Sequence, residues 1–357
     1  MQKFFCDLAM KNFLICFTLS ALFFSCTQKE PKPRYRIGLS LDTLKEERWQ
    51  RDRDYFVAAA EKLGAEVLVQ SANTDDARQI AQCENLLSQG VDALVIVPHN
   101  GKIMASIVES AHKQGIKVLA YDRIINDCDL DYYISFDNIR IGELQAEYLV
   151  ERAPKGNYVL IGGAPTDYNS ILLRQGQMNI LQPYIDRGDI KIVADQWAID
   201  WLPINALKHV ENALTVTDNR VDAIVVSNDG TAGGAIQALE EQHLAGKVLV
   251  SGLDADLAAC QRILAGTQAM TVYGPIRPLA EKAAEMAVKM CKNETISEAT
   301  QTVNNGKKDV PAILLPPITI DKNNLYESVI QHGYQKLEEV YKNVPKEQWP
   351  AASSGQL

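Results

Sequence analysis

From Tyr35 onward, short apolar runs typical of strands alternate with longer stretches of helical periodicity. The run Arg36 to Leu41 is followed by a segment with apolar residues at helical spacing, which ends at Gly64, and by a second run, Val67 to Gln70. A strand, a helix and a further strand in this order predict a βαβ unit. Its strands are parallel and covered by helices on both faces.

The same alternation continues along the chain, and its length favours more than one domain. Further strands are predicted at Ala93–Val97, Val118–Tyr121, Tyr132–Phe136, Tyr158–Gly162, Ile190–Ala194, Ala223–Val226, Val248–Ser251, Ala269–Tyr273 and Ile313–Ile320. We therefore expect an α/β protein with two doubly wound parallel sheets rather than one very long sheet. No linker rich in Pro, Gly or Ser separates the halves, so short hinge strands should join them, and helix Arg277–Met290 could belong to either lobe.

The first residues have the features of an export signal. Lys3 and Lys11 precede the apolar run Phe13 to Phe24, which is short for a membrane span and is followed by Ser25 and Cys26. Cys26 resembles the lipid acceptor of bacterial lipoprotein signals, which predicts a signal peptide at 1–25 and a lipid-anchored tether at 26–34. The alternative is an ordinary secretory peptide that leaves Cys26 as a free thiol.

The net charge of −9 argues against a nucleic-acid-binding face, because no cluster of Lys and Arg is present to replace phosphate counterions. Cleavage after residue 25 would remove two lysines and one aspartate, so the mature chain would be more acidic by one charge. The acidic body is expected to work at a membrane surface, held there by its lipid, without crossing the membrane.

Four cysteines follow Cys26, without any Cys-x-x-Cys spacing, at positions Cys83, Cys128, Cys260 and Cys291. An oxidising compartment would permit disulfides among them, and the sequence does not pair them. Their dispersion along the chain favours small buried hydrophobic residues instead.

Several common chemistries lack their sequence motifs. The chain has no phosphate-binding loop, no His-Glu-x-x-His, no Gly-x-Ser-x-Gly and no calcium-binding loop. The pairs Gly162-Gly163 and Gly233-Gly234 lack the Gly-x-Gly-x-x-Gly spacing of dinucleotide sites, so we interpret them as turn and packing glycines. We expect neither a cofactor nor a metal.

Polar residues recur where the predicted strands end. Strand Val118–Tyr121 is followed at once by Asp122 and Arg123, and the other strand ends are followed by Asp42 to Trp49, Asp167 and Asn169, Asn228 and Asp229, and Asp254. The carboxyl ends of parallel strands open onto a crevice where ligands bind. These residues are therefore expected to converge on one cleft between two facing sheets.

The residue types in this set suit a neutral sugar. Asp and Asn oxygens accept hydrogen bonds from hydroxyl groups, and Arg donates through a rigid fork. Trp49 and Trp201 add flat faces for the CH-rich sides of a pyranose ring. Each residue also has a structural alternative: Asp and Asn cap helices, Arg123 could pair with Asp122, and the tryptophans could be core or lid residues.

The chain resembles the bacterial periplasmic sugar-binding proteins of the ribose-binding type, and among them those that bind D-xylose. The resemblance covers Tyr35 to Val329 and rests on IGLSLDTLKEERWQRDRDYF, VLAYDRIIND, YISFDN, GGAPTDYNS, DQWAIDWLPINAL, SNDGTAGGAIQAL and SGLDADLA. It implies two α/β lobes joined by three hinge crossings, with the sugar between them. The expected lobes are 35–137 with about 275–310, and 138–274 with about 311–340; residues 341–357 are expected to be a disordered tail.

The resemblance also implies the site. Hydrogen bonds to the pentose are expected from Arg48, Asp122, Arg123, Asp167, Asn169, Asn228 and Asp254, and stacking from Trp49 and Trp201; Trp197 is expected nearby without contact. Where the family has a lysine, this chain has Gly274, so Arg277 or a water would take over its role, or the affinity or preferred sugar would differ.

The predicted function is capture of D-xylose or a close pentose by an exported, monomeric lipoprotein that delivers it to an ABC-type permease with its ATPase. A membrane receptor or sensor kinase is the alternative partner. A glycosidase using Asp122 and Asp254 as paired carboxylates is a further alternative, although we expect no enzyme activity. A transcription regulator is disfavoured, because an export signal stands where a DNA-binding motif would be needed.

Overall fold

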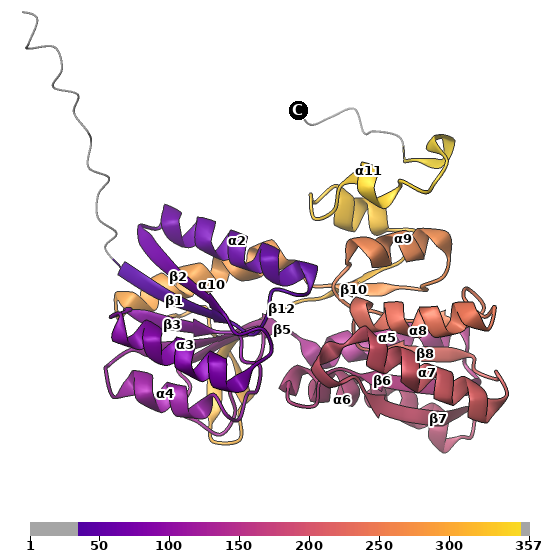
Figure 1. Ribbon diagram of the computed structural model, residues 1–357, viewed down its shortest axis with the longest axis horizontal. Helices are drawn as coiled ribbons and strands as arrows, with labels where there is room; N and C mark the ends of the chain where they lie inside the picture. Colours follow the sequence, from indigo (N-terminus) through magenta and orange to yellow (C-terminus); the bar gives the residue numbers. More distant parts are fainter. Residues whose placement is uncertain (1–34, 351–357) are drawn as a thin grey trace, which may run out of the picture. The chain divides into compact units, whose positions relative to one another are not determined.

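Two mainly parallel sheets organise residues 35–350, the part of the chain that the computed structural model describes (Figure 1). The predicted signal peptide, the predicted tether with Cys26 and the last seven residues lie outside the described residues. Each sheet with its helices is called a lobe here, the first containing β1 and the second containing β6. The α/β fold predicted from the alternation is confirmed.

The first lobe is built on a seven-stranded sheet with the order β11-β12-β5-β4-β3-β1-β2. Its neighbours are parallel except for β11 and β12, which form an antiparallel pair at one edge. The strands are β1 (Tyr35–Leu41), β2 (Ala65–Ser71), β3 (Ala93–Ile96), β4 (Lys117–Tyr121), β5 (Tyr132–Phe136), β11 (Gln301–Asn304) and β12 (Asp309–Leu315).

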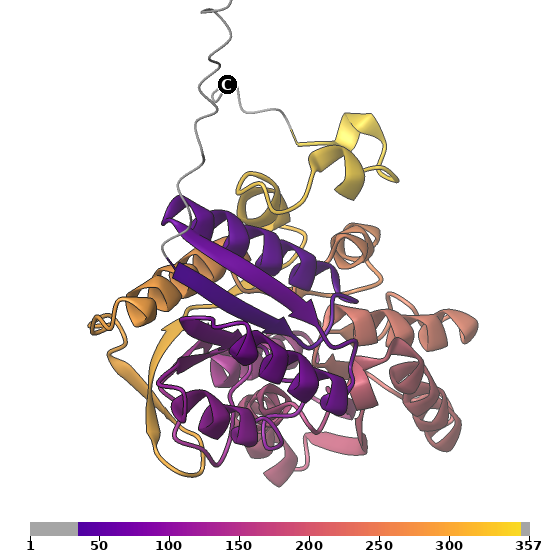
Figure 2. The ribbon, with the colours of Figure 1, turned by 60° about the vertical axis from the view of Figure 1, so that its left-hand side comes forward.

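Helices cover both faces of this sheet, as Figures 1 and 2 show: α2 (Glu47–Lys62) and α10 (Ile276–Cys291) on one face, and α3 (Asp76–Ser88) and α4 (Ala105–His112) on the other. The position of strand β3 between the two layers of helices explains why its sequence is continuously apolar. Ala93 and Val95 belong to the hydrophobic cluster on one face, whereas Leu94 and Ile96 belong to the cluster on the other. Successive side chains point to opposite faces, so a strand buried on both sides needs apolar residues throughout.

The second lobe contains a four-stranded parallel sheet with the order β7-β6-β8-β9, and an antiparallel pair, β10 with β13. Its strands are β6 (Gly156–Gly162), β7 (Ile190–Trp197), β8 (Ala223–Val226), β9 (Leu249–Val250), β10 (Thr271–Tyr273) and β13 (Ile318–Ile320). Its helices are α5 (Asn138–Arg152), α6 (Tyr168–Asp186), the 3-10 turn η2 (Ile199–Trp201), α7 (Pro203–Thr217), α8 (Asp229–Glu241), α9 (Leu257–Ala265), η3 (Tyr326–Ile330), α11 (Leu337–Val340) and η4 (Lys346–Gln348).

Within the described residues the chain passes between the lobes three times: after Phe136, at Gly274-Pro275 and at Pro316-Pro317. The sequence predicted one strand at Ile313–Ile320 and placed the third crossing near residue 311. Instead β12 remains in the first sheet, paired with β5, and β13 pairs with β10 in the second lobe. The two prolines separate them, because proline has no N–H group for a ladder hydrogen bond.

The expectation of a disordered tail from residue 341 is wrong for residues 341–350. Tyr341 is buried and its ring centroid lies 6.0 Å from that of Trp349, whose Nε1 donates to the carbonyl oxygen of Val344. These residues join a hydrophobic cluster with α9, β10 and β13. The two aromatic residues bury enough apolar surface to order a segment whose charges suggested a fraying helix.

The cysteines behave as small hydrophobic residues. Cys83, Cys128 and Cys260 are buried and Cys291 is half-buried, and all four are free thiols. Burial raises the pKa of the Cys83 thiol to about 12. Between residues 35 and 350, no helix combines the length and apolar character that crossing a bilayer requires.

Candidate functional site

All of the side chains predicted to contact a ligand line one pocket, which we call the central pocket. Arg48 and Trp49 stand in the first turn of α2, and Asp122 and Arg123 directly follow β4. From the second lobe come Asp167 and Asn169 at the start of α6, Trp201 in η2, Asn228 after β8, and Asp254 after β9. Both lobes therefore contribute their strand ends to the same pocket, as expected of parallel sheets.

Arg48 is surrounded by carboxylates. Its Nη2 lies 2.7 Å from Asp122 Oδ2, its Nη1 lies 3.4 Å from Asp254 Oδ1, and its Nε lies 3.3 Å from Asp52 Oδ2. Burial lowers the pKa of Arg48, but these carboxylates outweigh it and hold the pKa well above its usual value. The guanidinium is therefore permanently charged and links α2 to the second lobe through Asp254.

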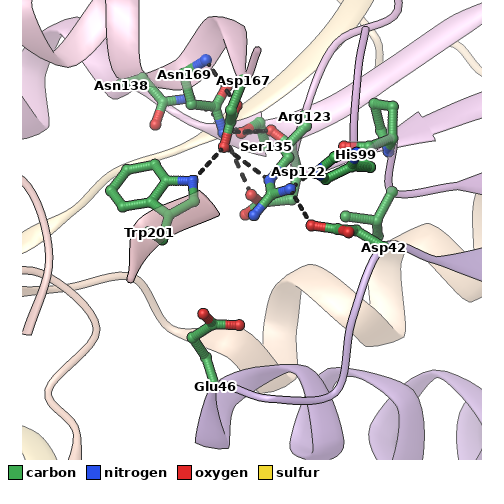
Figure 3. A network of polar contacts seen from close by, with 12 residues as sticks. Asp42, Glu46, His99, Asp122, Arg123, Ser135, Asn138, Asp167, Asn169 and Trp201 are labelled. Carbon is green, nitrogen blue, oxygen red and sulfur yellow. Dashed lines mark hydrogen bonds and ion pairs between the residues drawn. The ribbon is translucent and has the colours of Figure 1, made fainter. Parts of the chain in front are cut away.

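Arg123 pairs with different carboxylates (Figure 3). Its Nη1 lies 2.7 Å from Asp42 Oδ2, and its Nε lies 2.8 Å from Asp167 Oδ2 in the second lobe. The alternative that Arg123 pairs with its neighbour Asp122 is thus not observed. Asp122 uses its carboxylate for Arg48, so the two adjacent residues serve two separate ion-pair networks.

The backbone at Asp122 takes an unusual conformation, with φ of +64°. Three side chains donate hydrogen bonds to its carbonyl oxygen: Ser135 Oγ at 2.7 Å, Tyr133 OH at 2.9 Å and Asn169 Nδ2 at 2.9 Å. A non-glycine residue in the left-handed region is strained and persists only where its surroundings hold it. These donors hold the turn that directs Asp122 and Arg123 toward different partners.

Helix capping and pocket lining are combined in two residues. Asp167 Oδ1 accepts from the backbone N–H of Asn169 at 2.9 Å, while its Oδ2 faces Arg123 and accepts from Trp201 Nε1 at 3.3 Å. Asn228 Oδ1 accepts from the backbone N–H of Thr231 at 3.0 Å. The capping alternative is therefore correct for both residues, and it leaves their remaining polar atoms available to the pocket.

The two glycines at the end of β6 make room for tryptophan rings. A Cβ atom on Gly163 would overlap the ring of Trp201, and one on Gly162 would overlap the ring of Trp197. Trp201 lines the central pocket, whereas Trp197 lies outside it with the guanidinium of Arg174 5.0 Å from its ring centroid. This agrees with the interpretation of Gly162 and Gly163 as packing glycines.

Trp49 lies beside both arginines. It is buried, and the guanidinium carbons of Arg48 and Arg123 lie 4.3 Å and 5.3 Å from the centroid of its ring. Cation–π contacts of this kind fix the planes of the guanidinium groups. Trp49 therefore orients the donors of the pocket in addition to offering an apolar face.

Several pocket residues were missed by sequence reasoning. They are Phe136, Asn138, Ile141, Leu173, Leu253 and Ile276, whereas Glu46 lies within the stretch Asp42 to Trp49 that was expected at the cleft. Four of them belong to one hydrophobic cluster: Phe136, Ile141, Leu173 and Leu253. We call these four residues the apolar wall of the pocket. The sequence prediction used only polar residues that follow strands. Apolar residues of the hinge and of helices α5 and α6 therefore could not be recognised as pocket residues.

Gly274 lines the pocket at the second crossing. A Cβ atom there would lie 2.5 Å from Cε2 of Phe136, so the phenylalanine ring occupies the space that a side chain would need. Arg277 does not replace the family lysine: its side chain is 64% exposed, lies over Tyr55 and is not part of the pocket. The pocket is apolar at this point because Phe136 fills it.

Burial also raises the pKa values of carboxyl groups in and beside the pocket. It raises the pKa of Asp254 to about 6 and that of Asp52 to about 7, although Arg48 lowers both. Burial raises the pKa of Asp167 as well, against the opposing effect of Arg123. Among residues 35–350 no group of His, Cys, Asp and Glu is arranged to hold a metal ion. The site offers hydrogen-bond acceptors and fixed donors to a small polar molecule.

The sequence is similar to known binding proteins along most of its length. It is 57% identical to the "D-xylose-binding periplasmic protein" of Haemophilus influenzae over 306 residues, which covers 86% of this chain and 92% of that protein. It is 54% identical to the protein of the same name from Escherichia coli over 333 residues, covering 93% and 99% of the two chains.

The fold is similar to that of a carbohydrate transporter solute binding protein from Chloroflexus aurantiacus, solved in complex with D-glucose. The TM-score is 0.80 at 32% sequence identity, covering 85% of this chain and 97% of that one. The family model described as "Periplasmic binding protein domain" matches residues 37–295. With two lobes, three crossings and a pocket at the strand ends, the chain belongs to the periplasmic binding protein family.

Proposed function

We propose that the protein is an exported lipoprotein that binds D-xylose, or a closely related pentose, and delivers it to an ABC-type importer. The observation that carries this proposal is the composition of the central pocket. Two arginines, three aspartates, three asparagines and two tryptophans from both lobes line it, and each of these arginines and aspartates already has a partner of opposite charge. The two relatives named for D-xylose favour that sugar among the pentoses.

Sugar hydroxyl groups fit this arrangement, because each can donate to a carboxylate and accept from a guanidinium. A bound pentose would enter between Arg48, Asp122 and Asp254, whose mutual contacts it would exchange for contacts with the ring. Hydrogen bonds to charged groups contribute about 1.5–3 kcal/mol each. A few of them with stacking on Trp49 and Trp201 are enough for micromolar binding, which corresponds to about −8.2 kcal/mol.

The apolar wall supports a pentose in a second way. A pentopyranose carries an unsubstituted CH₂ group in its ring, whereas a hexose carries a hydroxymethyl group there. Phe136, Ile141 and Leu173 offer that position no polar partner, and an unpaired buried hydroxyl group is costly. Gly274, which stands where the resemblance implies a lysine, brings no side-chain donor to the pocket.

Catalysis is not part of the proposal. The chain belongs to a family of binding proteins, so it is a binding protein and not an enzyme, as expected from the sequence. Asp122 and Asp254, the residues considered for a glycosidase, both contact the same guanidinium group of Arg48. This shared contact suits two hydrogen-bond acceptors of a binding site.

Capture by two lobes explains how a membrane partner would recognise the loaded protein. A sugar that contacts both lobes favours the arrangement in which they are close together, by the difference in its affinity for the two arrangements. An importer permease would bind that arrangement; a receptor or sensor kinase is the alternative partner. Binding of the sugar-loaded protein to membranes that contain only the importer would distinguish them.

Calorimetric titration of the purified protein tests the ligand. We expect D-xylose to bind with a Kd in the micromolar range and more tightly than L-arabinose, D-ribose or D-glucose, with no turnover of xylosides. No heat with any of these sugars at millimolar concentration would show that the central pocket has another ligand.

The lipid anchor is a separate part of the proposal and concerns Cys26, which lies outside the described residues. Labelled palmitate should be incorporated into the full chain expressed in a bacterium, and the protein should sediment with membranes. Cys26→Ser should abolish both while D-xylose binding is unchanged. A soluble, unlabelled wild-type protein would mean that the signal is an ordinary secretory one.

A further inference from the structure

A second, smaller cavity adjoins the central pocket, and we call it the side pocket. It shares Glu46, Arg123 and Trp201 with the central pocket and is otherwise lined by residues that the sugar site does not use, among them Asp42 and His99. Ala164 and Asp200 close it from the second lobe. The side pocket and the central pocket therefore share Arg123 as a common wall.

Three polar atoms of the side pocket are buried and unpartnered within residues 35–350: Asp42 Oδ1, His99 Nε2 and Glu46 Oε2. Asp42 is 2% exposed; its Oδ2 pairs with Arg123, but its Oδ1 accepts no hydrogen bond. His99 Nε2 also has no hydrogen-bond partner, since Asp200 Oδ1 is 3.6 Å away and too distant for one. Buried polar atoms almost always have a partner, so a third group is needed here.

The Nδ1 atom and the backbone N–H of His99 both have hydrogen-bond partners. Its Nδ1 lies 2.8 Å from Asp76 Oδ1, and its backbone N–H donates to Gln79 Oε1 at 2.9 Å. A carboxylate partner requires the proton on Nδ1, which leaves Nε2 as an acceptor in the neutral ring or as a donor in the charged one. These contacts fix the ring plane, so that only Nε2 can serve a guest in the side pocket.

Figure 3 shows Asp42 and His99 on the same side of Arg123, with Trp201 and Asp167 on the opposite side. The side pocket, which Asp42 and His99 both line, has room for about one water molecule. It is polar on several sides, which is the condition for a small polar guest rather than a dry void. A metal ion is disfavoured, because no group of metal-ligating residues between 35 and 350 has the needed arrangement.

We propose that the side pocket binds one hydroxyl group, held between the carboxylate of Asp42 and the imidazole of His99, and that this contact strengthens sugar binding. The hydroxyl group donates to Asp42 Oδ1 and exchanges a second hydrogen bond with His99 Nε2. It thereby fixes the carboxylate that orients Arg123, whose Nη1 lies 2.7 Å from Asp42 Oδ2. His99 is thus a positioning residue for Arg123 and does not itself belong to the charged set of the central pocket.

The hydroxyl group has two sources, a bound water or the sugar itself, and the inference rests on the proposed sugar-binding function. The test compares D-xylose with D-glucose, which carries an additional hydroxymethyl group, by calorimetry on the wild type and His99→Ala. With a water in the side pocket, His99→Ala should weaken both sugars by the same factor, at least threefold. With a hydroxyl group of the sugar there, it should weaken at least tenfold the sugar that supplies the group, and the density between Asp42 and His99 in the sugar complex should be continuous with the ring rather than a separate water.

His99→Gln is the second variant, because an amide group can restore a hydrogen bond to the guest and should recover most of the lost affinity. His332→Ala is the matched control, since His332 is an exposed histidine far from the pocket in sequence. Thermal unfolding of each variant separates lost affinity from lost folding. A crystal structure with D-xylose should show density within hydrogen-bond distance of Asp42 Oδ1 and His99 Nε2.

Unchanged Kd values for both sugars in a folded His99→Ala protein, or a sugar complex without density between Asp42 and His99, would overturn the inference. A general loss of folding in both His99 variants, with no density at this position, would assign His99 a purely structural role. Failure of the wild type to bind any sugar is a different result: it would remove the proposed function, and the inference with it.

Discussion

Arg48 and Asp254 belong to different lobes, yet Arg48 Nη1 lies 3.4 Å from Asp254 Oδ1. Arg123 and Asp167 make a second contact of this kind, at 2.8 Å. The groups assigned to the sugar therefore also hold the two lobes to each other. A ligand that inserts between them exchanges one set of inter-lobe contacts for another, so binding and lobe arrangement are coupled through the same atoms.

Removal of either charged partner should weaken binding strongly. We expect Arg123→Ala and Asp254→Ala each to raise the Kd for D-xylose at least tenfold, because each removes a buried charged group of the central pocket and one ion pair between the lobes. Calorimetry measures the change, and circular dichroism verifies the fold. Glu240→Ala, at an exposed position of α8, is the control and should bind like the wild type. Affinity within twofold of the wild type in both charge variants would mean that the central pocket is wrongly assigned.

Substitution of Trp197 and of Trp201, which pack on Gly162 and Gly163, should affect sugar binding differently. Trp201→Ala removes a ring that lines the central pocket, so the Kd should rise on the order of tenfold, in keeping with the value of an aromatic contact. Trp197→Ala removes a ring outside the pocket and should lower the melting temperature while the Kd changes less than threefold. The reverse pattern would show that Trp197 contacts the sugar.

Gly274 and Phe136 should be energetically coupled. Gly274→Ala places a methyl group against the phenylalanine ring, which should cost about 1–3 kcal/mol of unfolding free energy. Phe136→Leu is smaller and should relieve the clash, so the double variant should be more stable than the sum of the two changes predicts. Urea denaturation measures all four proteins. Gly230→Ala, where the added methyl group meets only ordinary contacts, is the control; additivity of the two changes would contradict the coupling.

Stability should fall as the pH rises through neutrality. Unfolded aspartates ionise near pH 4, whereas burial raises the pKa of Asp52 and of Asp229 to about 7 in the folded protein. Between these values the native state binds more protons than the unfolded state, so the free energy of unfolding decreases with increasing pH. We expect a higher melting temperature at pH 5.5 than at pH 8.

Asp52→Asn isolates one of these groups. The amide cannot ionise, so this variant should lose less stability than the wild type between pH 5.5 and pH 8. Asp54→Asn, an exposed neighbour on α2, should keep the wild-type slope. Identical slopes for wild type and Asp52→Asn would mean that Asp52 is already ionised at pH 5.5.

The predictable part of the fold was the part governed by local pattern. Strands such as β3 and β8 are continuously apolar and buried on both faces, so periodicity located them within a residue or two. The run at Ile313–Ile320 was misread because its apolar residues continue on both sides of Pro316-Pro317. Only the pairing partners, β5 for β12 and β10 for β13, reveal two strands in two sheets.

The same distinction applies to the site. Asp122, Arg123 and Asn228 could be found because charged and amide residues are unusual directly after buried strands, where they carry a clear signal. Phe136 and Leu173 could not, since an apolar residue in a strand or helix looks the same whether it faces a core or a ligand. Asp52 was also missed: it stands one helical turn after Arg48, and its contacts with Arg48 and Tyr121 depend on packing between α2 and β4.

The three crossings also set the order in which the molecule can be completed during synthesis. Strand β12 completes the first sheet, and helix α10 covers one of its faces. Both follow the entire four-stranded sheet of the second lobe along the chain. A ribosome that has released only the first 137 residues has produced a lobe that lacks one covering helix and two strands. The nascent first lobe therefore cannot be completed until the whole four-stranded sheet of the second lobe has been synthesised.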